Sequence, residues 1–209
     1  ISPYIGIWTN LTPDHLERHG TLKRYREIKK SLLDKSKIRI FNADDKDLMA
    51  NRSNFLKGIW ISTKGRGSEK NPANYWINKN GMIMENKKEL FNSLALKLPG
   101  KHNLQNLLLV TAAARSIGLT AKGIESSLQS FQGLSHRLEL LFDLEGLRIF
   151  NDSKATNFES GCIGLQAVQA PAVLLAGGQI KEGSPNQWIK QIHITTCGVV
   201  LFGESANLL

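Results

Sequence analysis

The stretch LRIFNDSKATNFES, residues 147–160, decides how the fold is interpreted. Its first four residues are typical of a β-strand, whereas Thr156 and Glu159 stand three apart in the capping-box pattern that begins a helix. A helix directly after a strand is the unit from which parallel α/β sheets are built. Asp152 and Lys154 then fall on a tight loop, where a lysine beside free backbone N–H groups can contact a phosphate or carboxylate. Ordinary helix capping is the alternative interpretation.

The same order of elements continues on both sides of this stretch. LLAGGQIK (174–181) predicts a buried strand, two glycines that permit close approach of the backbone, and then Lys181. FQGLSHR (131–137) predicts a loop, and LELLFDLEGLRIF (138–150) predicts a hairpin that begins a new unit. We therefore place a domain boundary near residue 134.

The first part of the chain also alternates strands and helices. Three runs are typical of strands: YIGIW (4–8), KIRIF (37–41) and GIWIS (58–62). YWINKNGMIM (75–84) predicts a hairpin with a two-residue turn at Asn80-Gly81. HNLQNLLLVTAAARSIG (102–118) predicts a helix that ends at Gly118, and Thr120 is placed to cap the next helix. The expected fold class is therefore α/β, with a mostly parallel sheet covered by helices.

The composition excludes several classes of protein. The 209 residues are 41% hydrophobic and 22% charged, with room for one large domain or two small ones. No apolar run approaches the ~20 residues that span a bilayer. Two cysteines make no disulfide framework, so we expect a reducing cytoplasm. The net charge of +9 indicates anionic partners, either nucleic acid or phosphorylated small molecules. Because the chain begins at Ile1 in an apolar run and ends just after a strand, we interpret it as a piece of a longer protein.

A lysine on the apolar side of a helix is the first candidate site residue. At about 100° per residue, RYREIKKSLL (24–33) predicts an amphipathic helix in which Lys29 lies between Tyr25 and Leu33. A lysine can extend along apolar surface and keep its ammonium in water. Alternatively the amine is used, since partly buried lysines are readily modified. His15 follows the first strand, where ligands collect in α/β sheets, and could face the same pocket.

Two further pairs of polar residues are placed for ligand binding. Asn103 and Asn106 stand three apart on one helix face, where their amides could contact a base edge. Capping of the helix by Asn103 is the alternative. His136 and Arg137 lie at the expected domain junction, where ligands often bind.

Together these segments resemble the Mur ligase family. The resembling segments, in the family's order, are NLTPDHLERHGT with YREIK, FNADD, LPGKHNLQN, FQGLSHRLE, NDSKATN and LLAGG. NDSKATN is the most specific, because relatives that add a diamino acid or L-alanine usually carry a DYAH-like sequence there. The resemblance implies part of the central ATPase-type domain at 1–134, without its phosphate-binding loop, and a truncated Rossmann-like C-terminal domain at 135–209.

The resemblance implies an ATP-dependent amide-bond ligase of peptidoglycan precursor synthesis. Such an enzyme uses ATP to phosphorylate the carboxylate of UDP-N-acetylmuramoyl-L-alanine, and the amine of D-glutamate then displaces phosphate. The implied cofactors are ATP and Mg²⁺, and no nucleic acid or membrane insertion is expected of this cytoplasmic monomer. Because no G-x-x-G-K-[ST] sequence occurs in the chain, we expect these residues alone to be inactive.

The resemblance also implies roles for single residues. His15 would bind magnesium, and Lys29, as a carbamate, would help to hold the ion; Lys154 would be the third catalytic residue. The implied nucleotide contacts are Asn103, Asn106, His136, Arg137, Asp152 and Lys154. The amino-acid substrate would meet Thr156 and Lys181, although this chain has Gln179-Ile180-Lys181 where the family often has Asp-Lys.

Two alternatives stay open from the sequence. Folylpolyglutamate synthase is a relative with similar chemistry on another acceptor, but its pattern around the catalytic lysine differs from TPDHLERHGTLKRY. A basic nucleic-acid-binding module could be built on KRYREIKK and the lysine-rich middle of the chain. Against it, the chain lacks the aromatic-interleaved basic strand that RNA-binding sheets use.

Overall fold

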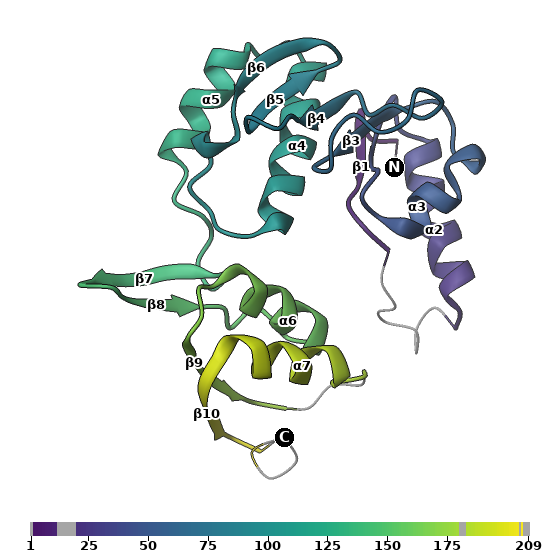
Figure 1. Cartoon of the computed structure of the whole chain (residues 1–209). Helices are drawn as coiled ribbons and strands as arrows, with labels where there is room; N and C mark the ends of the chain where they lie inside the picture. The colour runs from purple at the N-terminus through teal and green to yellow at the C-terminus, as the bar shows by residue number, and fades with distance from the viewer. Residues whose placement is uncertain (1, 12–19, 180–182, 205, 207–209) are drawn as a thin grey trace. The chain divides into compact units, whose positions relative to one another are not determined.

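The computed structural model describes residues 2–11, 20–179, 183–204 and 206. The chain divides into two compact units. The first unit contains residues 1–97 and 103–131, and the second contains residues 98–102 and 132–209. The described buried clusters fall within one unit or the other, so each unit has its own core. Figure 1 shows the helices and strands of the two units.

The first unit is built on a six-stranded sheet whose order in space follows the chain. The strands are β1 (Ile5–Trp8), β2 (Ile38–Asn42), β3 (Ile59–Ser62), β4 (Tyr75–Ile77), β5 (Met82–Glu85) and β6 (Lys88–Asn92). The first four strands are parallel, and the last two extend the sheet in antiparallel fashion. The three strands expected near residues 4–8, 37–41 and 58–62 are confirmed, and β6 is an additional strand.

The described helices of the first unit are α2 (Leu22–Asp34), α3 (Lys46–Ala50), α4 (Lys101–Ser116) and α5 (Ala121–Ser130), with short 3-10 turns at Arg52–Asn54 and Ser93–Ala95. Three of them, α2, α3 and α5, begin after a capping residue: Thr21, Asp45 and Thr120. Thr120 caps α5 by accepting from Gly123 N at 3.1 Å, as expected. Gly118 follows α4 with φ +92°, a conformation that favours glycine.

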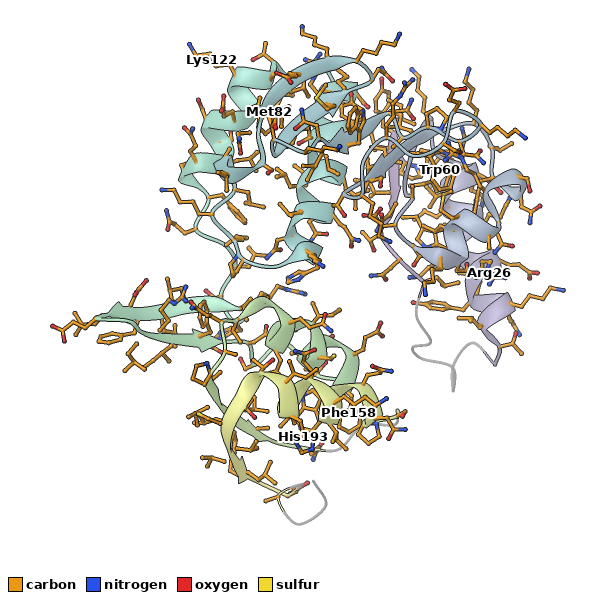
Figure 2. All side chains as sticks on the ribbon, viewed as in Figure 1. Arg26, Trp60, Met82, Lys122, Phe158 and His193 are labelled. Carbon is orange, nitrogen blue, oxygen red and sulfur yellow. The ribbon has the colours of Figure 1, made fainter. Side chains whose placement is uncertain are left out.

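The strands of this sheet present opposite faces to two sets of helices. Ile40 and Ile61 pack with α4 and α5, whereas their neighbours Phe41 and Trp60 pack with α2 and α3. Phe41 and Trp60 stack with ring centroids 4.8 Å apart, and Trp60 is labelled in Figure 2. Side chains alternate along a strand, so coverage of both faces explains the continuous apolar runs in the sequence. The expected α/β class is confirmed.

The hairpin between β4 and β5 is confirmed, but its turn differs from the expected one. Asn78 N donates to Met82 O at 3.0 Å, which leaves three residues in the connection instead of two. Gly81 adopts φ +76°, as the left-handed position of a three-residue hairpin loop requires. The side chain of Asn78 accepts from Asn80 N and Met82 N, and it stabilises the longer loop.

The second unit contains a hairpin, two helices and a pair of parallel strands. Its elements are β7 (Glu139–Leu144), β8 (Leu147–Asn151), α6 (Phe158–Ala167), β9 (Ala172–Gly177), α7 (Asn186–Thr195) and β10 (Thr196–Phe202). Cys162 and Leu165 of α6 and Trp188 of α7 form the buried core. Phe158, labelled in Figure 2, packs on Trp188 with ring centroids 5.5 Å apart. The order strand, helix, strand, helix, strand agrees with the expectation.

The strand β9 is not the fully buried strand that its sequence predicts. Leu174 and Ala176 pack in the core, whereas Val173 and Leu175 are 59% and 66% exposed. Within the described residues only one face of the β9–β10 pair is covered, by α6 and α7, so burial alternates along the strand. None of the helices in the described part of the chain has the length and apolarity needed to cross a membrane.

Candidate functional site

The turn after β2 holds the chain that leaves β1. The buried Asn42 donates from Nδ2 to Thr9 O at 2.9 Å. Asp45 caps α3 by accepting from Leu48 N at 2.8 Å, and its second oxygen accepts from Leu11 N at 3.2 Å. These bonds fix residues 9–11, the described residues that lead toward His15. His15 itself lies outside the described residues.

Asp44 joins three elements at the carboxyl end of the sheet. Its carboxylate accepts from Ser62 Oγ at 2.7 Å, from Thr63 N at 2.9 Å and, more weakly, from Gln105 Nε2 of α4 at 3.4 Å. Burial acts to raise the pKa of Asp44, but the hydrogen bonds from Thr63, Ser62 and Gln105 outweigh it and the pKa is lowered. Asp44 is therefore held as a carboxylate whose oxygens are occupied by protein donors.

Lys29 lies half-buried on α2, on the same side as the buried Leu33. Its Nζ stands 4.6 Å from the centroid of the Tyr25 ring, which is within cation–π range. The next residue, Lys30, points to a different partner and forms an ion pair with Asp34 at 2.6 Å. Both lysines are half-buried, but Lys29 contacts an aromatic ring whereas Lys30 contacts a carboxylate.

The asparagine pair of the sequence lies in the first turns of α4. Asn103 is half-buried and Asn106 is exposed, and their spacing of three places them on one face of the helix. Because the helix begins at Lys101, Asn103 lies inside it and not at its N-cap. Gly100 precedes the helix with φ +98°, which a residue with a side chain adopts only with strain.

In the second unit, the turn 134–138 and the loop 151–156 are bonded to each other. Lys154 N donates to His136 O at 3.0 Å, and Leu138 N donates to Asp152 Oδ1 at 2.9 Å. His136 and Leu138 adopt φ +65° and +47°, left-handed conformations that are uncommon outside glycine. The expected ligand residues His136, Arg137, Asp152 and Lys154 therefore lie on two loops of the same unit that hold each other.

Asp152 is packed against α6 at a glycine. A Cβ at Gly164 would overlap Asp152 Oδ2, so only glycine permits this approach. Burial raises the pKa of Asp152, against the Leu138 N–H and the positive charges of His102 and Arg137. Burial also lowers the pKa of His102, and the charge of Asp152 opposes that effect. The half-buried carboxyl of Asp152 thus has a higher pKa than an exposed aspartate.

Helix α6 begins one residue later than the capping-box pattern predicts. Asn157, and not Thr156, caps α6 by accepting from Ser160 N at 2.8 Å. The expected cap at Thr156 is therefore wrong, and its exposed side chain is not used in capping. Lys154 is exposed as well. Lys181 lies outside the described residues.

The sequence analysis missed Asn151, Glu139 and Gly164. Asn151 Oδ1 accepts from Ser153 N at 3.1 Å, and Glu139 Oε2 accepts from His136 N at 2.8 Å. The first bond is an Asx turn, for which Asn-Asp-Ser is a recognisable local signal. The contacts of Glu139 and Gly164 depend on how the loops pack, so a local pattern could not indicate them.

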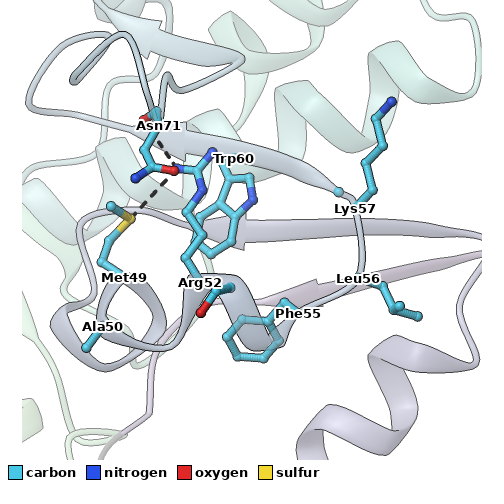
Figure 3. A pocket seen from close by; sticks show the side chains of 10 residues that line it. Met49, Ala50, Arg52, Phe55, Leu56, Lys57, Trp60 and Asn71 are labelled. Atoms are coloured by element: carbon cyan, nitrogen blue, oxygen red, sulfur yellow. Dashed lines mark hydrogen bonds between the residues drawn. The ribbon is translucent and has the colours of Figure 1, made fainter.

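The described candidate residues form no metal cluster, and they do not line the pocket found in the first unit. Among the described residues, no group of three or more His, Cys, Asp or Glu side chains could hold a metal ion. A pocket of about 480 Å³ in the first unit is lined by Met49, Ala50, Arg52, Ser53, Phe55, Leu56, Lys57, Gly58, Trp60 and Asn71 (Figure 3). There Arg52 lies 4.2 Å from the Trp60 ring centroid and donates to Asn71 O, which is a packing role.

Comparison with known proteins gives the family. The Mur ligase middle domain matches residues 1–114, more than half of the chain. The chain therefore belongs to the Mur ligase family. It is similar to the UDP-N-acetylmuramoylalanine–D-glutamate ligase of Prochlorococcus marinus strain MIT 9313, with 56% identity over 100% of this chain and 45% of that protein. The ligase of the same name from Synechococcus sp. strain CC9605 is 50% identical over the same shares.

Solved structures agree with the fold. UDP-N-acetylmuramate-alanine ligase MurC of Thermotoga maritima covers 99% of this chain with 48% of its own, at a TM-score of 0.74 and 22% identity. The MurF ligase of Thermotoga maritima in complex with ADP covers 98% of this chain with 50% of its own, at a TM-score of 0.68 and 17% identity. These identities show the fold alone. The chain spans less than half the length of the curated relatives that it matches.

Proposed function

We propose that this chain is part of an ATP-dependent ligase that adds D-glutamate to UDP-N-acetylmuramoyl-L-alanine. One observation carries the proposal: relatives of that name match 98–100% of the chain at 50–57% identity. In this proposal residues 1–134 belong to the central ATP-binding domain and residues 135–209 to the C-terminal domain. In this proposal the protein would act in the cytoplasm, as a monomer.

The candidate nucleotide contacts are divided here by unit. In the first unit, the amides of Asn103 and Asn106 would contact the base from one face of α4. In the second unit, the two bonded loops would bring the remaining contacts: His136, Arg137, Asp152 and Lys154. Thr156, which is exposed and does not cap α6, would contact the amino-acid substrate together with Lys181.

The chemistry is activation of a carboxylate. An oxygen of the precursor's carboxylate attacks the γ-phosphorus of ATP, ADP leaves, and an acyl phosphate forms. The amine of D-glutamate then attacks the carbonyl carbon, and phosphate leaves with one of the original carboxylate oxygens. The exposed ammonium of Lys154 would stabilise negative charge on the phosphoryl group during transfer. The backbone N–H groups of Ser153, Lys154 and Ala155, which the sequence predicted to be free, are bonded within the protein and would not contribute.

Magnesium does not fit the described residues as they stand. An unmodified lysine ammonium has three donors and no acceptor, so Lys29 cannot ligate a cation in this form. We therefore assign no step to the ion. A carbamate on Lys29 would replace the positive charge by a negative one and would supply oxygen ligands beside His15, which is the modification that the family resemblance implies.

An acceptor assay tests the proposal. The completed enzyme is defined as these 209 residues joined to the flanking segments of the Prochlorococcus relative. Its phosphate release should require ATP, UDP-N-acetylmuramoyl-L-alanine and D-glutamate together, with L-alanine, diaminopimelate and L-lysine as poor acceptors. Preference for one of these amino acids would assign the chain to a sister enzyme. Glutamate addition to a folate would assign it to the folylpolyglutamate branch.

A further inference from the structure

The side chain of Asn151, the last residue of β8, is held in one orientation. The backbone N–H of Ser153 donates to Asn151 Oδ1 at 3.1 Å, so the amide oxygen faces Ser153. The amide nitrogen, Nδ2, then lies 2.8 Å from His136 Nδ1. The reverse orientation of the amide would set two N–H donors against each other at Ser153. Asn151 is therefore a donor toward His136.

This orientation determines which nitrogen of His136 carries the proton. An amide nitrogen donates and does not accept, so His136 Nδ1 must be the acceptor and carries no hydrogen. The neutral ring then has its hydrogen on Nε2. The ring is exposed, and within the described part of the chain Nε2 makes no hydrogen bond. His136 thus presents a single N–H donor to its surroundings.

The backbone around His136 is fixed by the same two loops. Glu139 Oε2 accepts from His136 N at 2.8 Å, and Lys154 N donates to His136 O at 3.0 Å. These bonds hold the left-handed φ of +65° at His136. Uncommon backbone conformations persist where the surrounding structure holds them, and they cluster at ligand sites. The same two loops therefore determine both the position of the His136 ring and the nitrogen that carries its hydrogen.

We propose that Asn151 is a positioning residue that fixes His136 in its Nε2–H form, so that His136 donates a hydrogen bond to an acceptor atom of the nucleotide. The acceptor is a nitrogen of the base or an oxygen of the ribose or phosphates, which share this chemistry. The hydrogen bond from His136 to the nucleotide, which is the ligand half of the inference, rests on the proposed function. The ring form of His136 does not, because it follows from the bonds that Asn151 makes with Ser153 N and His136 Nδ1 alone.

The ring form is measured by NMR of isotope-labelled imidazole nitrogens in the completed enzyme, with His136→Gln used to assign the signals. The wild type should show an unprotonated Nδ1 and a protonated Nε2. Asn151→Asp, which offers acceptors only, should move the hydrogen to Nδ1. Asn186→Ala, at an exposed asparagine whose side chain makes no hydrogen bond in the described residues, should change nothing. A protonated Nδ1 in the wild type would overturn the proposal.

The ligand half is measured by kinetics and binding. Loss of one hydrogen bond should raise KM for ATP about fivefold in Asn151→Asp, with a smaller change in kcat. Separate titrations with adenosine and with tripolyphosphate identify which part of the nucleotide loses affinity. An unchanged KM in a variant with an altered ring form would overturn the ligand half. Absence of ATP binding in the wild type would contradict the proposed function, whereas the NMR result would still decide the ring form.

Discussion

For Lys29, a packing role and a chemical role predict opposite effects of substitution. Its half-buried side chain lies on the packed side of α2, and its amine stands over the ring of Tyr25. A lysine that only packs would be replaced without loss by an apolar residue, because that residue suits the packed side better. A lysine that carries a carbamate could not be replaced, because the negative charge would disappear with it.

We expect Lys29→Ala to reduce the activity of the completed enzyme by about 100-fold or more, the size typical of removing one electrostatic group from a reacting centre. Its free energy of unfolding should change little, because the side chain is half-exposed. Short carboxylic acids in the buffer should restore part of the activity by occupying the vacated anion position. Lys30→Ala is the control, since it removes a half-buried lysine of the same helix that pairs with Asp34, and its activity should stay near that of the wild type. Full activity of Lys29→Ala would return Lys29 to a packing role.

Asp44 should make the stability of the first unit depend on pH. Its pKa is lowered in the folded state, below the ordinary value of 3.8. The ionised form is therefore favoured by folding, and the resulting stability is complete above that ordinary value and is lost as pH falls through the lowered pKa. Urea denaturation of Asp44→Asn across acidic pH should show a flatter pH dependence than the wild type. Asp143→Asn, at an exposed aspartate of β7, should keep the wild-type slope; an equal slope in Asp44→Asn would refute the assignment.

At the scale of elements, local patterns predicted what depends on neighbours in the sequence. The strands β1, β2 and β3 could be predicted because β-rich apolar runs are bounded by polar loops, and α5 because Thr120 is a capping residue. The start of α6 could not be placed exactly, because threonine and asparagine are both favoured at an N-cap, and Thr156 and Asn157 are adjacent. Which of the two caps the helix depends on the path of the loop, which the bond from Lys154 N to His136 O sets.

The candidate site was partly predictable for the same reason. The spacing of Asn103 and Asn106 is a property of one helix, so the sequence was sufficient to place both on one face. The bonds between the 134–138 turn and the 151–156 loop join residues that are far apart in the chain. Asn151 and Glu139 therefore acquire their roles only when the hairpin β7–β8 brings the two loops together.

The packing of α6 on the loop 151–156 gives a prediction for one glycine. Gly164→Ala would place a methyl group in the position of Asp152 Oδ2, so either the helix or the loop must move. We expect a loss of about 1–3 kcal/mol in the free energy of unfolding, together with weaker ATP binding. Gly198→Ala in β10 is the control, because a Cβ there would meet only Val173 Cγ2, at 4.0 Å, which is an ordinary van der Waals contact. Equal stability and affinity in the Gly164 variant would show that the approach of Asp152 is not required.

At the scale of the whole molecule, each unit carries its own set of candidate residues. The first carries Lys29 and the asparagine pair on α4, and the second carries the two bonded loops. No phosphate-binding G-x-x-G-K-[ST] sequence occurs among the 209 residues. We therefore expect the 209 residues alone to release no phosphate from ATP, and they serve as the negative control for the completed enzyme.

The transfer of oxygen during the reaction tests the central claim most directly. The completed enzyme is supplied with ATP, D-glutamate and UDP-N-acetylmuramoyl-L-alanine whose terminal carboxylate carries heavy oxygen. If the carboxylate attacks the γ-phosphorus and the amine then displaces phosphate, each turnover moves one labelled oxygen into the released phosphate. Mass spectrometry should therefore find label in phosphate in proportion to the amide formed. Amide formation with unlabelled phosphate would contradict the acyl phosphate and, with it, the proposed function of this chain.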